Sequence, residues 1–214
     1  MRNEAKQGNK RIMALVEKLP YFSIKNLLAA GIDSHYLRIL LSRQAKAKKI
    51  IRLKKGLYVS RNYLEEAKAA GRISPLLEFL ACAIYAPAYL SGEYILYRHN
   101  LLTEVPQNFT LMTVNKTARF LNPLGNFIYH TIQPKLFVGF ESLRAGDFTI
   151  AQASKAKALF DFLYLRKNLI TNKEIFKELR LNLDVLSARD RKELKTYVNL
   201  EGSVKMKYLY SLIT

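Results

Sequence analysis

Basic and hydroxyl side chains recur between residues 34 and 55 at spacings that suit contact with the phosphates and base edges of a nucleic acid. Arginine donates two parallel hydrogen bonds to the edge of a guanine, and lysine binds a phosphate as a compact point charge. Serine and histidine add donors and acceptors of shorter reach. The residues expected to supply this chemistry are Ser34, His35, Arg38, Ser42, Arg43, Lys46, Arg52, Lys54 and Lys55. For His35, a plain surface position fits the sequence equally well.

Three short elements must position these side chains. A helix is predicted from Ser23, whose hydroxyl can cap it, to Gly31, which can end it in a left-handed conformation. A second helix over residues 34–46 has a leucine face and a separate basic face, so it can dock on its neighbours and still present side chains to a major groove. A hairpin over residues 50–59 follows, and Gly56 can supply the positive φ of its turn.

The order helix, turn, helix and basic hairpin predicts a winged helix-turn-helix, in which the second helix enters the major groove and the hairpin is the wing. The side chains expected at base edges or the adjacent phosphates are Arg38, Ser42 and Arg43. Those expected on flanking phosphates are Arg52, Lys54 and Lys55. A preceding helix with one buried face is predicted over residues 9–19, and Pro20 ends it.

The positive charge is unevenly distributed along the chain. The whole sequence has 35 Lys and Arg against 17 Asp and Glu, a formal net charge of +18. Residues 1–61 hold 15 of the basic residues and only three of the acidic ones, so about two-thirds of the excess lies in under a third of the chain. A concentrated excess indicates a polyanionic partner. Double-stranded DNA fits better than an anionic membrane surface, because the apolar residues of this stretch are needed for a compact core.

Beyond residue 71 the sequence favours a second, mixed domain. A connecting helix is predicted over residues 61–71, before this domain. Within the domain, helices are predicted over residues 74–85, 92–101, 154–168, 173–181, 188–200 and 202–214. Strands are predicted over residues 109–114, 118–121, 126–131, 136–140 and 148–150, which suggests a small, mostly antiparallel sheet. The expected fold class is therefore α+β. A winged helix-turn-helix domain is predicted over residues 1–61 and a mixed domain with C-terminal helices over residues 72–214.

The composition indicates a cytoplasmic protein. No stretch approaches the roughly 18 consecutive apolar residues of a transmembrane helix, and the charged residues 1–11 lack the apolar run of a signal peptide. The single cysteine, Cys82, excludes an internal disulfide, and its apolar neighbours favour a small buried side chain.

No pattern in the sequence indicates an enzyme, a metal site or a bound cofactor. His35, His99 and His130 fall in different elements, without a second ligand at a suitable spacing. The sequence contains neither a phosphate-binding glycine loop nor a G-x-S-x-G motif. Ser91 is interpreted as the cap of the helix that follows it, and Asp161, within an apolar helix, as one half of a buried ion pair.

Three segments of the sequence resemble the AbiEi-type antitoxins, the transcriptional-regulator half of type IV toxin–antitoxin systems. The first, IIRLKKGLYV, is similar to the R-x-x-x-G-x-Y ending of the family's wing at Arg52, Gly56 and Tyr58. The second, AYLSGEYILYRHNLLTEVPQNFTLMT, matches at Tyr89, Ser91, His99 and Leu101, with Asn100 where a glycine is common. The third, FTIAQASKAKALFDFLYL, resembles A-x-x-E-K-A-L-x-D at Ala151, Lys157, Ala158, Leu159 and Asp161, with Ala156 where the family often has glutamate.

The resemblance covers roughly residues 10–167 and implies a repressor that binds inverted repeats upstream of its own operon. Binding to such a repeat implies two copies of the protein on the DNA. The resemblance also implies that the C-terminal domain counters a nucleotidyltransferase-like toxin without forming a stable complex with it. From Lys173 onward no motif of the family is matched.

Two other interpretations stay open. In one, the basic domain is an RNA- or protein-binding module without a preference for any duplex sequence. In the other, the second domain holds an enzyme site near Ser91, Glu93 and His99. A pocket that converges on those residues, with a perturbed carboxylate, would distinguish the second alternative.

Overall fold

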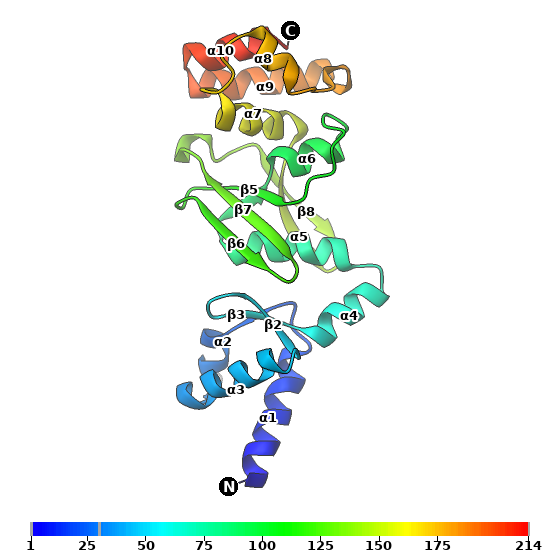
Figure 1. The fold of residues 1–214 in the computed structure, drawn as a ribbon, viewed down its shortest axis with the longest axis vertical. Helices are drawn as coiled ribbons and strands as arrows, with labels where there is room; N and C mark the ends of the chain where they lie inside the picture. Colours follow the sequence, from blue (N-terminus) through cyan, green and yellow to red (C-terminus); the bar gives the residue numbers. More distant parts are fainter. Residues whose placement is uncertain (1, 30, 214) are drawn as a thin grey trace. The chain divides into compact units, whose positions relative to one another are not determined.

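The structure, a computed structural model, describes residues 2–29 and 31–213. The described residues form ten α-helices, two short 3-10 helices and two sheets, so the protein is a mixed α+β protein (Figure 1). Two compact units divide the chain. The first holds the residues up to Leu80 together with Phe120–Gly125, and the second holds Ala81–Arg119 and the residues from Asn126 on. The domain bounds at residues 1–61 and 72–214 stay a prediction, because compactness alone does not show which segment folds by itself.

The first unit begins with helix α1 (Arg2–Val16). This helix starts earlier than the predicted helix over residues 9–19, because its first turns are polar and leave no periodic apolar signal. It also ends earlier. The backbone N–H of Leu19 bonds the carbonyl of Val16 at 3.2 Å, a tight turn that closes the helix before Pro20 is reached.

Two capped helices follow, α2 (Ile24–Ala29) and α3 (Ser34–Lys46), and both were predicted. The hydroxyl of Ser23 accepts the backbone N–H of Asn26 at 3.2 Å, and the carboxylate of Asp33 accepts the backbone N–H of Tyr36 at 2.8 Å. Each bond satisfies a donor that the start of a helix leaves unpaired. The core of this unit joins the leucine face of α3 to α1, the first strand and the hairpin through Ile12, Val16, Phe22, Leu27, Leu37, Leu40, Leu41, Ile50 and Tyr58.

A small antiparallel sheet completes this part of the unit. Its strands are β1 (Phe22–Ser23), β2 (Ile50–Lys54) and β3 (Leu57–Ser60), in the order β1-β3-β2. Gly56 has a φ of +81° in the turn between β2 and β3, as predicted. The exposed Arg52 lies on β2 between two buried neighbours, as alternation along a strand requires, whereas every residue of β3 is buried.

Helices α4 (Arg61–Ala69) and α5 (Ile73–Ile84) lead out of the hairpin. The hydroxyl of Ser60 caps α4 by accepting the backbone N–H of Tyr63 at 3.4 Å. None of the described helices has both the length and the apolar character needed to cross a membrane.

The sheet of the second unit has six strands in the order β6-β7-β5-β4-β9-β8. They are β4 (Ala88–Leu90), β5 (Phe109–Thr113), β6 (Ala118–Asn122), β7 (Gly125–Thr131), β8 (Phe140–Ala145) and β9 (Phe148–Ala153). The pairs β4–β9 and β5–β7 are parallel, whereas β4–β5 and β8–β9 are antiparallel. The sheet is therefore mixed, and the expectation of a mostly antiparallel sheet overlooked its two parallel pairs.

One predicted strand is wrong. Residues 136–140 form the end of a 3-10 helix, Pro134–Leu136, and a loop, while the neighbouring strand begins only at Phe140. Pro134 starts this turn because its fixed φ suits a helical start and its missing N–H removes a donor from any ladder. Cys82 is half-buried rather than fully buried, and its Sγ lies 3.5 Å from the carbonyl oxygen of Ala151.

Five helices accompany this sheet: α6 (Gly92–Arg98), α7 (Lys155–Arg166), α8 (Lys173–Glu178), α9 (Ala188–Glu201) and α10 (Val204–Ser211). Helix α6 is shorter than the helix predicted over residues 92–101. Figure 1 shows α7 between the sheet and the C-terminal helices. It contacts α6 on one side and α9 and α10 on another, and every residue from Ala156 to Leu163 is buried. Over residues 156–163 this helix has no solvated face, so each polar residue of that stretch needs a partner inside the protein.

The Asp190 carboxylate at the start of α9 is expected to make the stability of the protein depend on pH. Asp190 and Ser187 bond each other's backbone N–H at 2.9 and 3.1 Å, and the Lys155 ammonium lies 2.9 Å from Asp190. Burial raises the pKa of Asp190, but the bonds from Lys155 and Ser187 outweigh it and hold the pKa below its ordinary value of 3.8. A carboxylate with a lowered pKa stabilises the fold above that ordinary value and loses its contribution as the pH falls below it.

Asp190 occupies the third helical position in the capping box whose N-cap is Ser187. Asp190→Ala is therefore expected to lower the free energy of unfolding by about 1 kcal/mol at pH 7, the order of magnitude of one helix-capping bond. The difference from the wild type should shrink as the pH falls below the ordinary aspartate pKa. Urea unfolding at pH 7 and at acidic pH measures it. A difference of the same size at both pH values would mean that the charge of Asp190 contributes nothing.

Candidate nucleic-acid interface

The exposed side of α3 carries the residues that the sequence singled out. Four leucine and glutamine positions of this helix are buried against the core, whereas His35, Arg38, Ser42, Arg43 and Lys46 are exposed. Ser34 is half-buried in the first turn. The burial of one face of a helix by apolar contacts fixes which side chains must point outward, and here they include three basic residues, Arg38, Arg43 and Lys46, as well as the apolar Ile39.

A hollow of about 730 Å³ lies between α3, α2 and the β2–β3 hairpin. Six of the nine predicted contact residues line it together: Ser34, Arg38, Ser42 and Lys46 from α3, and Arg52 and Lys55 from the hairpin. Its apolar floor includes Ile24 and Leu28 of α2 and Tyr58 of β3. Residues about 20 positions apart in the sequence are thus brought to one concave surface, which we call the α3–hairpin groove.

All charged side chains that are described in the lining of this groove are positive. The groove is lined by four cationic side chains, Arg38, Lys46, Arg52 and Lys55, and none of the described residues lining it is acidic. Like charges held in a concave surface focus a positive potential outward, which raises the local concentration of an anionic partner. The hollow is open rather than enclosed.

Three predicted residues lie outside the lining of the groove. His35 and Arg43 are exposed on α3, so both can reach an extended ligand beside the groove. Lys54 is half-buried, and its ammonium lies 6.0 Å from the ring of Phe120, which belongs to the same compact unit. Because an aromatic ring attracts a nearby cation, Lys54 is less available to a phosphate than the exposed Lys55.

Two structural residues were not predicted as site residues: Tyr58, which lines the groove, and Arg61, which does not. Tyr58 forms part of the floor and stacks on Phe22 with ring centroids 5.7 Å apart. The Nε of Arg61 donates to the carbonyl of Lys48 at 2.7 Å, which ties the start of α4 to the segment after α3. Tyr58 could have been found, because it ends the R-x-x-x-G-x-Y segment. The role of Arg61 depends on a contact between elements that no local pattern shows.

A buried polar cluster is the main chemical feature of the second unit. The Asp161 carboxylate accepts bonds from the Lys157 ammonium at 2.7 Å, the Ser91 hydroxyl at 2.7 Å and the Tyr89 hydroxyl at 3.0 Å. The Lys157 ammonium also donates to the carbonyl of Leu136 at 2.9 Å. The side chains of Lys157 and Asp161 are 0% exposed, so the pair that the sequence predicted for Asp161 is present and fully buried.

The pKa shifts in this cluster have clear physical causes. Burial raises the pKa of Asp161, while the Lys157 ammonium and the two hydroxyl donors oppose that shift. Burial lowers the pKa of Lys157, and the carboxylate opposes it. Burial and the nearby Asp161 carboxylate raise the pKa of Tyr89. Every polar group here has a bonding partner and no exposed surface, which is typical of a structural network.

The interpretation of Ser91 as a helix cap is wrong in one respect. Ser91 does occupy the position before α6, but its side chain makes no capping bond and donates to Asp161 instead. Glu93 forms an ion pair with Arg166. Burial lowers the pKa of His99, and the Lys155 and Arg98 charges add to that effect. The structure therefore directs Ser91 into the buried cluster rather than towards Glu93 or His99.

Among the described residues, no group of three or more His, Cys, Asp or Glu side chains is placed to hold a metal ion. Comparisons of the sequence with protein-family models and with curated proteins found no match.

Proposed function

We propose that this protein is a sequence-specific, DNA-binding transcriptional regulator whose first unit is a winged helix-turn-helix. In this proposal α3 is the recognition helix and the β2–β3 hairpin is the wing. Arg38 and Ser42 contact base edges or adjacent phosphates in the major groove, and Arg52, Lys46 and Lys55 hold phosphates on either side. His35 and Arg43 extend the contact beyond the groove.

One observation carries this proposal: the α3–hairpin groove gathers four cations without an acidic residue among its described lining. A capped helix of 13 residues forms one wall, so its side chains are held on a rigid element. The hairpin forms the other wall and places Arg52 and Lys55 beside the helix. A rigid helix beside a basic hairpin suits the width of a major groove and the phosphates that flank it.

We further propose that the protein acts as an autorepressing antitoxin of a type IV system. The support is the resemblance of three segments to the AbiEi-type antitoxins. Two of them meet in the structure, since Tyr89 and Ser91 of the second segment bond Asp161 of the third, beside Lys157. If the residues of both segments are needed for one buried hydrogen-bonded cluster, proteins that share these segments are expected to share the fold of this domain. In this proposal the partners are inverted repeats upstream of the operon and a nucleotidyltransferase-like toxin that is countered without a stable complex.

A salt titration of a wing variant tests the interface. Lys55→Ala removes one phosphate contact, so affinity is expected to fall about equally for the protein's own upstream DNA and for a shuffled duplex. The slope of log K against log salt should become shallower by about one unit for that contact. Lys54→Ala should change the slope less, because Lys54 is half-buried beside Phe120.

The matched control is Lys68→Ala, which removes an exposed lysine of α4 that lies outside the groove lining. Fluorescence anisotropy with labelled duplexes at four salt concentrations measures all three variants. The control should keep the wild-type slope. A Lys55→Ala slope equal to that of the control would remove the hairpin from the interface.

A further inference from the structure

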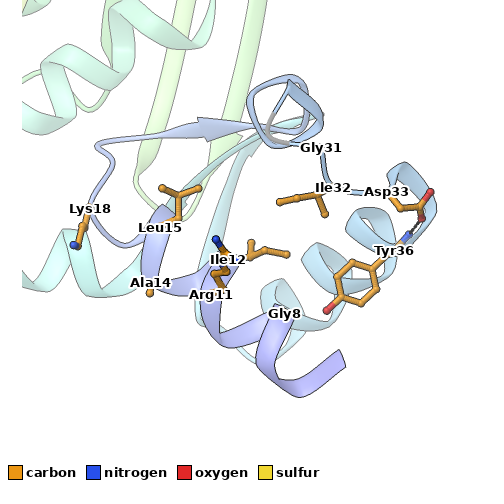
Figure 2. A pocket seen from close by; sticks show the side chains of 10 residues that line it. All are labelled: Gly8, Arg11, Ile12, Ala14, Leu15, Lys18, Gly31, Ile32, Asp33 and Tyr36. Carbon is orange, nitrogen blue, oxygen red and sulfur yellow. Dashed lines mark hydrogen bonds between the residues drawn. The ribbon is translucent and has the colours of Figure 1, made fainter. Parts of the chain in front are cut away.

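A second hollow, of about 820 Å³, lies on the first unit away from the α3–hairpin groove. One wall is α1, and the other is the connection from α2 to α3 with the first turn of α3. Figure 2 shows Ile12 of α1 and Ile32 and Tyr36 of the opposite wall directed towards the same space. We call this surface the α1 hollow.

The lining of the α1 hollow combines an apolar body with two cations. Arg11 lies on α1 and Lys18 in the turn that follows this helix, and both side chains are exposed. Leu15, which lies between them in the sequence, is 48% exposed although it is a large apolar side chain, whereas Ile12 and Val16 of the same helix are buried. The acidic residue of the lining, Asp33, has its carboxylate engaged by the backbone N–H of Tyr36. The lining therefore combines apolar side chains with two cations whose charge no described lining carboxylate neutralises by an ion pair.

These features favour one class of occupant. A volume of this size, apolar walls and a few charged groups are typical of small-molecule sites. A second copy of the chain is a poorer fit, because the described side chains of α1 include the basic Lys10 and Arg11 and no acid, so two copies would bring like charges together. A ligand with an apolar body and an anionic end matches both the apolar and the cationic side chains of the lining.

We propose that the α1 hollow binds a small amphipathic carboxylate, with its chain against Ile12, Leu15 and Ile32 and its carboxylate at Arg11 or Lys18. The site shares Asp33 and Tyr36 with the start of α3, so an occupant touches the helix that carries Arg38. This proposal does not depend on the DNA-binding function, because binding is measured with the protein alone.

Octanoate is the probe, and 1-octanol is its uncharged match in chain length. Amide shifts of the ¹⁵N-labelled full chain are followed during each titration. Octanoate is expected to give saturable shifts in residues 8–18 and 31–36, with a dissociation constant on the order of 1 mM for a ligand of this size. Octanol is expected to bind several-fold more weakly at the same residues.

Two variants separate the contribution of the apolar side chains to binding from that of the two cations. Leu15→Glu places a like charge on the apolar wall and should abolish the octanoate shifts, and the exposure of Leu15 makes the substitution compatible with folding. Arg11→Gln with Lys18→Gln should bring octanoate down to the affinity of octanol. The amide spectrum of each variant shows directly whether it is folded.

Four results would overturn the proposal. The first is amide shifts that never saturate or that lie outside these two segments. The second is equal affinity of the wild type for octanoate and octanol. The third is octanoate binding by Leu15→Glu that equals that of the wild type. The fourth is a different occupant. Shifts of the same residues on raising the protein concentration alone would assign the hollow to a second copy, and tighter binding of the peptide acetyl-Glu-Glu-Leu-Glu-Glu-amide would assign it to a protein partner.

Discussion

Replacing Asp161 with alanine is expected to destabilise the second unit by about 3–5 kcal/mol, the cost of removing one partner from a buried ion pair. The substitution leaves the Lys157 ammonium, which is 0% exposed, without its carboxylate. The hydroxyls of Ser91 and Tyr89 lose their acceptor at the same time. Since α7 is enclosed on all sides, water cannot replace these bonds without opening the helix packing.

The matched control removes both charges together. In Lys157→Met with Asp161→Leu, apolar side chains of similar size fill the same space, and such exchanges are often neutral or stabilising. The double variant should therefore lie closer to the wild type than Asp161→Ala does. Urea unfolding followed by far-UV circular dichroism, with the transitions of the two units fitted separately, measures the differences. A loss below about 1 kcal/mol in Asp161→Ala would contradict a stabilising role for the cluster.

Arg38→Ala is expected to weaken binding to the protein's own upstream DNA by roughly 10–100-fold, which corresponds to about 1–3 kcal/mol for an arginine that reads a base edge. Arg38 is the arginine of α3 that lines the α3–hairpin groove, and it faces outward from a helix whose opposite side is buried. Affinity for a shuffled duplex should fall less, because a base contact adds energy only on the correct sequence.

The comparison variant for Arg38 is Arg189→Ala, which removes an exposed arginine from α9 in the second unit. It should leave both affinities close to those of the wild type. Anisotropy titrations at one salt concentration are sufficient, since the ratio between the two duplexes is the quantity of interest. An equal loss on both duplexes in Arg38→Ala would show that Arg38 contacts only phosphate.

The helices of the first unit were predictable because their signals are local. Asp33 caps α3 from an adjacent position, the leucine spacing defines its buried face, and its predicted bounds, 34–46, are confirmed. Gly56 was placed correctly for the same reason, since a tight turn demands a positive φ where it occurs. Contact between the helix and the hairpin was harder to foresee, and the sequence did not show which of the predicted contact residues share one hollow.

The sheet of the second unit was predicted less well, because long-range pairing defines it. Strand β4 has three residues, all buried, so it has no alternating pattern to reveal it. Strand β8 reads FESLRA and is mostly exposed at the edge of the sheet, where its partner β9 holds it by backbone bonds. Parallel pairing joins strands that are distant in the sequence, and no local signal records it.

The hydrogen bond of Ser91 could not be predicted either, because its partner is distant in the sequence. A serine before a helix usually caps it, and this one precedes α6. Its hydroxyl instead bonds Asp161, which lies 70 residues further along the chain. Because Asp161 is fully buried in α7, its carboxylate needs hydrogen-bond donors from neighbouring side chains. That requirement outweighs the local capping bond that Ser91 could make.

The central claim, that the first unit reads a DNA sequence, is tested most directly by titrating the full chain with its own upstream DNA and with a shuffled duplex of equal length at several salt concentrations. A basic groove alone binds any duplex, and such binding fades together on all sequences as salt rises. Base contacts by α3 add a preference that salt does not remove. A clear preference for the upstream DNA that persists as salt rises is the predicted result. Equal affinities that fall in parallel would contradict the claim and leave the groove as an electrostatic anchor only.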